Sequence, residues 1–176
     1  MHPEQPERLI EIVNKLKAST VADEIEWIIN FVSLKTMTAI LKISFSCYLV
    51  TAIVSIAFGI IYLTRSEFMP YHAVALEREW TELDIKTQTL ILALMRVAGG
   101  GFLATGMVVI LLIYLYIKTT EEWIIFIIPT IGFVTSFSSL YATLLVKNRT
   151  PGLPPVNLTL LSIGLMVTGF ILSLGA

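Results

Sequence analysis

The sequence predicts an all-α membrane protein, a four-transmembrane-helix bundle in up-down-up-down order that follows an amphipathic N-terminal helical extension. Of the 176 residues, 56% are hydrophobic and only 14% are charged, whereas a soluble domain is about 25% charged. The mean hydropathy is +0.82. Four apolar stretches are long enough to cross a hydrocarbon core of about 30 Å as helices. They are residues 37–63, 87–117, 123–146 and 156–174.

The extension, residues 1–36, carries apolar side chains at helical spacing, first around Leu9 and Leu16 and again around Ile25 and Val32. Charged residues occupy the opposite faces, which is typical of amphipathic helices. We expect the apolar faces to lie in the membrane interface or on a partner protein. A solvated helical extension is the alternative. The predicted domains are therefore the extension, residues 1–36, and the bundle, residues 37–176.

Small and hydroxyl-bearing side chains recur on one face of the first, third and fourth spans. Such stripes are typical of helix–helix contacts in lipid, and packing is favoured over an ion path because no carboxylate lies inside a span. Pro129 predicts a kink or a local break in the third span. The stripes are Ser44, Thr51, Ser55 and Gly59; Gly132, Ser136, Ser139 and Thr143; and Ser162, Gly169 and Ser173.

The loop between the first two spans, residues 64–86, contains aromatic side chains typical of interface anchors: Phe68, Tyr71 and Trp80. Pro70 predicts the start of a short surface helix. Thr81, followed by Asp84 three residues later, resembles a capping signal. We therefore expect the second helix to start in water.

The second span contains three consecutive glycines, Gly99, Gly100 and Gly101, and one cation, Arg96. The glycines favour close helix packing. The alternative is an unwound segment that lines a ligand cavity. Gly132 and Ser136 of the third span are further candidates for helix packing.

The motifs EFMPYHA (residues 67–73), WTELD (80–84) and LMRVAGGG (94–101) resemble a group of uncharacterised small bacterial four-helix membrane proteins, loosely similar to the DoxX-like families. The similar region covers about residues 60–155, and the extension departs from the pattern. The resemblance implies a four-helix fold and a bacterial inner (plasma) membrane location, and no reaction. Lysine and arginine counts on the two sides are nearly equal, so the acidic, aromatic loop is the basis for placing both termini in the cytoplasm.

The composition argues against several kinds of site. Cys47 is the one cysteine, and His2 and His72 are the two histidines. We therefore expect no metal site, no haem and no other cofactor. The net charge of −1 gives no reason to expect nucleic-acid binding. No catalytic constellation is evident, so an enzyme is disfavoured.

Arg96 is the strongest candidate for contact with a ligand, a lipid or a partner, because charges inside spans are costly. Its depth is marginal, and the alternative is an arginine that reaches the headgroups. Internal partners would come from Glu67, Glu82 or Asp84, or from the neutral candidates Tyr71 and His72.

These observations predict a non-catalytic accessory or structural subunit of a larger membrane assembly, with membrane lipids and other membrane-protein subunits as partners. The alternative is a binder or carrier of a small hydrophobic or amphiphilic ligand, a lipid or a quinone, held near Arg96 and the loop at residues 67–72. A third hypothesis, an enzyme in which His72 transfers a proton with Glu67 or Asp84, has less support.

Overall fold

The computed structural model describes residues 21, 25 and 37–175. The predicted N-terminal extension lies outside the described residues, except for Val21 and Ile25. The rest forms helices only: α2 (Ala39–Thr64), α3 (Pro70–Leu76), the short 3-10 helix η1 (Trp80–Glu82), α4 (Ile85–Thr119), α5 (Trp123–Arg149) and α6 (Val156–Leu174). Within this part of the chain, α2, α4, α5 and α6 are each long and apolar enough to cross a membrane. The predicted all-α membrane bundle is confirmed.

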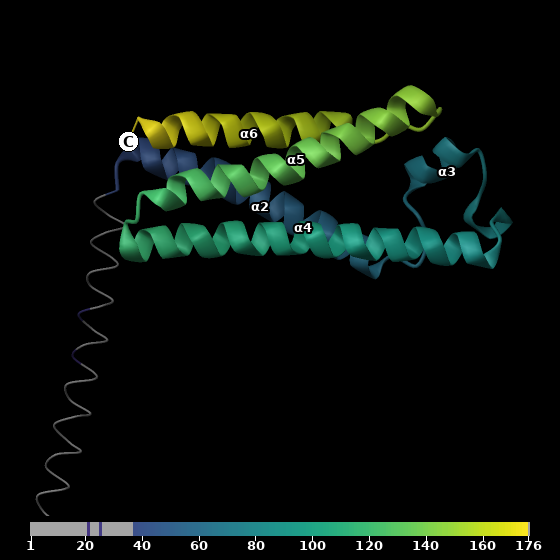
Figure 1. Cartoon of the computed structure of the whole chain (residues 1–176), viewed down its shortest axis with the longest axis horizontal. Helices are drawn as coiled ribbons and strands as arrows, with labels where there is room; N and C mark the ends of the chain where they lie inside the picture. Colours follow the sequence, from purple (N-terminus) through teal and green to yellow (C-terminus); the bar gives the residue numbers. More distant parts are fainter. Residues whose placement is uncertain (1–20, 22–24, 26–36, 176) are drawn as a thin grey trace, which may run out of the picture. The chain divides into compact units, whose positions relative to one another are not determined.

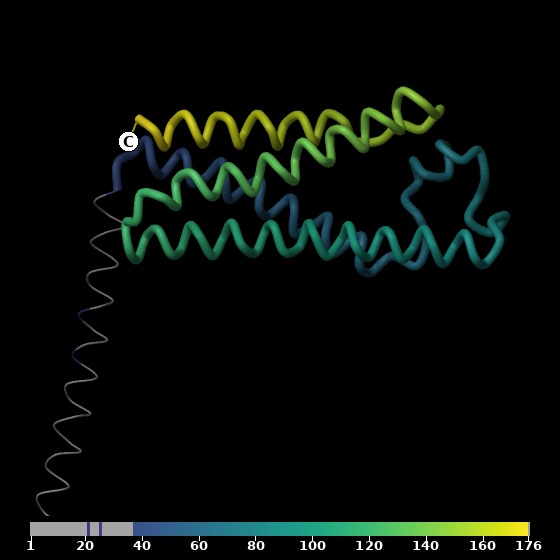
Figure 2. The backbone as a smooth tube through the Cα atoms, in the orientation of Figure 1, coloured from purple at the N-terminus to yellow at the C-terminus, as the bar shows by residue number. Residues whose placement is uncertain are grey.

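Helix α2 lies between α4 and α6, and α5 packs against α6 and α4 (Figure 1). The chain reverses direction at each connection, which confirms the up-down-up-down order (Figure 2). Helices α4 and α5 are close at the turn that joins them and diverge toward the end where α3 lies (Figure 1). Helix α5 continues through the buried Pro129, so of the two predicted outcomes, a kink or a local break, the break does not occur.

The helix boundaries follow from local chemistry. Asp84 caps α4, because its carboxylate accepts hydrogen bonds from the main-chain nitrogens of Lys86 and Thr87 at 3.0 and 3.2 Å. Residues Trp80–Glu82 form the 3-10 turn before this cap. The cap residue is thus Asp84, and α4 begins in the exposed loop as the sequence predicts.

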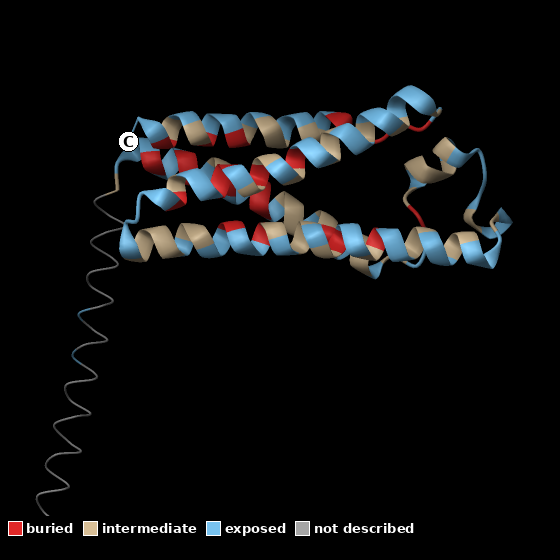
Figure 3. Ribbon diagram, viewed as in Figure 1, coloured by how far each residue is buried: buried red, intermediate tan, exposed pale blue. Residues whose placement is uncertain are grey.

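The outward faces of the spanning helices carry exposed apolar side chains, and the buried residues face the other helices (Figure 3). Outward apolar faces are expected where lipid is the solvent. The most fully buried large side chains include Tyr48, Ile124 and Ile128, each 0% exposed. Ser44 joins α2 to α6 through a 2.6 Å hydrogen bond from its hydroxyl to the Gly169 carbonyl oxygen. Buried side chains and this hydrogen bond therefore hold α2 against α6 in the first half of α2.

Glycines set the close approach of α2 and α4. A Cβ added to Gly99 would lie 2.9 Å from Tyr62 Cβ, and one added to Gly106 would lie 2.6 Å from the Ala52 carbonyl oxygen. A Cβ on Gly100 or Gly101 would meet no atom within 4 Å. Within this chain the close packing expected of the glycine triplet is therefore made by Gly99, and Gly106 is a packing glycine that the sequence patterns do not single out.

Candidate functional site

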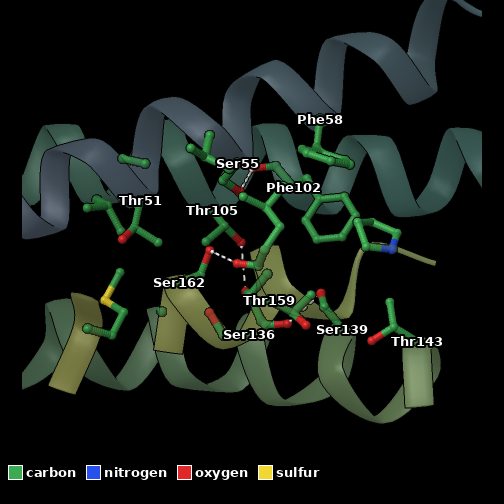
Figure 4. A pocket seen from close by; sticks show the side chains of 18 of the residues that line it. Thr51, Ser55, Phe58, Phe102, Thr105, Ser136, Ser139, Thr143, Thr159 and Ser162 are labelled. Atoms are coloured by element: carbon green, nitrogen blue, oxygen red, sulfur yellow. Dashed lines mark hydrogen bonds between the residues drawn. The ribbon is translucent and has the colours of Figure 1, made fainter. Parts of the chain in front are cut away.

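A cavity of about 100 Å³, here called the inner cavity, lies among α2, α4, α5 and α6. Nine of its twenty lining residues are serine or threonine, two are tyrosine, and none is charged. Figure 4 shows these hydroxyl groups converging from four helices on one space. The serines and threonines are Thr51 and Ser55 on α2, Thr105 on α4, Thr135, Ser136, Ser139 and Thr143 on α5, and Thr159 and Ser162 on α6.

A second space of about 500 Å³, here called the outer cleft, lies between α4 and α5. It adjoins the inner cavity, because Phe102, Thr105 and Ser139 are among the residues that line both. Exposed residues form part of its rim, including Gly101 on α4 and Ser138 on α5. The cleft therefore opens sideways between two spanning helices, where lipid would lie in a membrane.

Helix α3 closes the loop end of both spaces. The phenol oxygens of Tyr71 on α3 and Tyr62 on α2 are 2.5 Å apart and share a hydrogen bond. Close packing against the α5–α6 turn holds α3 in place, because a Cβ on Gly152 would lie 2.8 Å from Ala75 Cβ. Burial raises the pKa of the Tyr71 phenol, so this group stays neutral.

His72 lines the outer cleft beside Tyr71, with 4.2 Å between the two ring centres. Its Nδ1 accepts a hydrogen bond from the main-chain nitrogen of Met69 at 3.3 Å. Burial lowers the pKa of the imidazole, so the ring is neutral near pH 7 and carries its proton on Nε2.

Most serine and threonine hydroxyls along the inner cavity donate their hydrogen to an oxygen atom of the protein. Six donate to a carbonyl oxygen three or four residues earlier in their own helix, which is a common arrangement for serine and threonine. Ser55 donates across to the Phe102 carbonyl oxygen of α4 at 2.7 Å. The six are Thr51, Thr135, Ser139, Thr143, Thr159 and Ser162.

Thr105 is the eighth hydroxyl. Its oxygen lies 3.0 Å from that of Thr135. Because Thr135 donates to the Ile131 carbonyl oxygen, Thr105 is the donor in this pair. Its hydroxyl therefore links α4 to α5 across the cavity.

Ser136 differs from the other eight. It is 7% exposed, it lines the inner cavity (Figure 4), and its hydroxyl forms no hydrogen bond with any residue in the described part of the chain. Among the described residues, the fully enclosed side-chain oxygen without a partner is that of Tyr48 and not that of Ser136, so the Ser136 hydroxyl keeps access to the space of the cavity that it lines. Ser136 is thus a candidate ligand contact as well as the packing residue that the sequence suggests.

Arg96 lines neither the inner cavity nor the outer cleft. Its guanidinium donates hydrogen bonds of 2.5 Å to the main-chain carbonyl oxygens of Tyr62 and Arg65, at the end of α2. A cation at a helix C-terminus is favourable, because the last carbonyl groups carry partial negative charge. Among residues 37–175, no acidic side chain forms an ion pair with it. The geometry supports a structural role for Arg96.

The sequence-predicted site residues are therefore divided. Tyr71 and His72 lie together on α3 at the loop end of the two spaces, here called the roof. Asp84 caps α4, Glu67 is exposed, and neither lines the inner cavity or the outer cleft. Sequence patterns placed six of the nine serine and threonine residues of the wall in helix-packing stripes, and they missed Thr105, Thr135, Thr159 and Tyr62, which no stripe included. Metal binding has no support in the described residues, where no three His, Cys, Asp or Glu side chains form a group.

Comparison with protein families, curated proteins and solved structures finds no match for this chain. The resemblance of residues 60–155 to the DoxX-like families therefore stays a prediction.

Proposed function

We propose that this integral membrane protein binds or carries a small, uncharged amphiphilic molecule taken up from the membrane. The observation that carries the proposal is the inner cavity, which eleven hydroxyl-bearing side chains and no charged side chain line. The outer cleft adjoins this cavity, which supports a sideways path for a lipid-soluble molecule between α4 and α5. Of the hypotheses drawn from the sequence, the geometry therefore supports the ligand binder best.

The chemistry of the wall favours an uncharged ligand. A charge placed inside a span is costly unless an opposite charge accompanies it, and the wall offers none. Neutral polar groups, in contrast, find hydrogen-bond partners along the whole cavity. The outer cleft, at about 500 Å³, falls within the usual size of small-molecule sites, about 300–1,000 Å³.

Binding is favoured over passage through the membrane. At the start of α5, Ile124 and Ile128 are 0% exposed, and Tyr48 of α2 is equally buried. This packed apolar end of the bundle supports a cavity that does not continue to the side of the membrane where α5 begins.

The test is mass spectrometry of the protein gently extracted from its own membrane. Ser139→Leu places bulk where the inner cavity meets the outer cleft, and Thr130→Leu is the matched control, an exposed residue of the same helix that lines neither space. We expect the wild type and Thr130→Leu to carry one defined small molecule, and Ser139→Leu to carry at least about tenfold less. If the wild type carries none, or if Ser139→Leu retains it fully, the proposal is wrong.

An accessory subunit is the second candidate. Gly100, which lines neither the inner cavity nor the outer cleft, has open space where a side chain would lie, and small residues allow another helix to approach closely. If this function holds, partner proteins of fixed stoichiometry should co-purify with the wild type, and Gly100→Leu should lose them without losing its own fold. A lone chain in native mass spectrometry would contradict it.

We also propose that the protein resides in a bacterial inner membrane with both termini in the cytoplasm, so that the loop between α2 and α4 is outside. In a Cys47→Ser background, a cysteine at the exposed Glu79 should react with a membrane-impermeant thiol reagent in intact cells. Protection of that cysteine until the cells are lysed would reverse the orientation.

A further inference from the structure

We infer that the ligand of the inner cavity has a hydrogen-bond donor as its polar head, an alcohol or a phenol rather than a ketone, an ester or an ionised group. The inference rests on the proposed function and narrows its ligand class. It follows from the serine and threonine hydrogens of the cavity wall, almost all of which are donated to oxygens of the protein, and from Ser136, a residue 7% exposed whose hydroxyl has no hydrogen-bond partner among the described residues.

Eight of the nine serine and threonine hydroxyls in the wall donate to oxygens of the protein. Each of these oxygens keeps a lone pair that can accept another hydrogen bond. The carbonyl oxygen of a ketone or ester ligand would face lone pairs of the wall oxygens, with no hydrogen atom to form a bond between the two. A ligand hydroxyl instead supplies the missing hydrogen.

Ser136 makes the preference specific for a group that both donates and accepts. Its free hydrogen can be given to the oxygen of a ligand hydroxyl, whose own hydrogen then goes to a neighbouring wall oxygen. A ketone can satisfy Ser136 but leaves the wall oxygens without a donor. An alcohol satisfies both sides, so we expect it to bind about tenfold more tightly than its methyl ether, the effect of one net hydrogen bond.

The position of Ser136 also gives the ligand a direction. Ser136 lines the inner cavity alone, whereas Thr143 lines the outer cleft as well. The two residues are separated along α5 by about 10 Å, at a rise of 1.5 Å per residue. The head therefore lies deep in the bundle, and the tail leaves through the outer cleft toward lipid. At the roof, the Tyr62–Tyr71 pair leaves one further phenol hydrogen free, so a ligand with a second oxygen could reach it.

The probes for the test are a dodecanol that carries a photoreactive diazirine in its tail and the methyl ether of the same molecule. The whole protein is placed in phosphatidylcholine nanodiscs, because this headgroup has no hydrogen-bond donor and competes little for the site. Labelled peptides are mapped by mass spectrometry, and labelling counts as specific when a hundredfold excess of plain dodecanol removes it. We expect specific labelling by the alcohol on the stretch of α5 that lines the outer cleft, between Val134 and Val146, and about tenfold less by the ether.

Ser136→Ala should lower specific labelling by the alcohol toward the level of the ether, whereas Thr130→Val, an exposed residue of α5 outside both spaces, should leave it unchanged. Ser136→Cys, which keeps a side chain of similar size, guards against a folding defect, and unfolding temperatures are measured for all variants. Equal labelling by alcohol and ether, or a preference for the ether, overturns the donor inference and leaves the proposed function standing. No specific labelling by either probe overturns both.

Discussion

Gly59 of α2 and Gly99 of α4 face each other so closely that neither has room for a side chain. A Cβ on Gly59 would lie 2.9 Å from the Gly99 carbonyl oxygen, and a Cβ on Gly99 would lie 3.0 Å from the Gly59 carbonyl oxygen. Because main-chain atoms form the obstacle on both sides, no side-chain rotation can relieve it. The crossing of α2 and α4 therefore depends on these two glycines.

Gly99→Ala should lower the free energy of unfolding by about 1–3 kcal/mol, the usual cost of overpacking. Gly100→Ala is the matched control, because a Cβ there meets no atom within 4 Å and alanine favours a helix over glycine. Unfolding in a denaturing detergent series measures both. Equal stability of the two variants would contradict the close crossing.

Arg96→Met should destabilise the junction of α2 and α4 by about 2 kcal/mol or more, since hydrogen bonds from a charged donor contribute about 1.5–3 kcal/mol each. Arg96→Lys should recover part of the loss, because a single ammonium group lacks the planar fork that reaches two carbonyl oxygens. Arg65→Ala is the control and should retain the bond, because Arg96 donates to the main-chain carbonyl oxygen of Arg65 and not to its side chain.

The same Arg96→Met variant tests whether Arg96 has a structural role only or also contacts the ligand. Because Arg96 lines neither space, specific labelling of the cavity by the alcohol probe should persist in the folded fraction of the variant. Its complete loss in folded protein would restore Arg96 as a ligand contact.

Tyr48→Phe should leave the stability unchanged or raise it by up to about 2 kcal/mol. The Tyr48 side chain is 0% exposed, and its hydroxyl has no hydrogen-bond partner among the described residues. Removing an unsatisfied buried hydroxyl removes its desolvation cost while the ring still fills its place. Thermal unfolding measures the change, and a loss above about 1 kcal/mol would indicate a hydrogen bond that the structure lacks.

The roof at α3 should weaken in acid. Burial lowers the pKa of His72 from its ordinary value of 6.5, so the unfolded loop binds protons more readily than the folded loop does. The contribution of neutral His72 to the stability of the folded loop is complete above pH 6.5. It is lost as the pH falls from that value toward the lower pKa of the folded state. Protonation of Nδ1 also removes the bond from Met69.

Hydrogen exchange of the α3 amides, corrected for intrinsic rates, should therefore show less protection at pH 5.5 than at pH 7.5. In His72→Gln the difference should disappear. Amides of α6, which contains no histidine, provide the internal reference. Equal protection of α3 at both pH values in the wild type would contradict the prediction.

The sequence predicted those features that depend on a residue and its near neighbours in the chain. Each span is long and apolar enough to partition into a membrane on its own, so hydropathy located all four to within a few residues, such as Ala39–Thr64 for the predicted 37–63. Asp84 could be recognised as part of a capping signal because a cap acts within one turn. Arg96 could be recognised as unusual for the same reason, since its cost arises from its own position in an apolar segment.

By itself, then, the sequence determined that this protein is a bundle of four membrane-spanning helices and which helix faces carry hydroxyls. Only the tertiary structure decided that Gly99, rather than Gly100 or Gly101, meets α2, and that Arg96 binds main-chain oxygens of another helix. It also decided that hydroxyls from four helices line one cavity, in which the Ser136 hydroxyl has no hydrogen-bond partner among the described residues. The physical reason is that span formation depends on each segment's own composition, whereas a cavity depends on crossing angles and contacts between segments far apart in the chain.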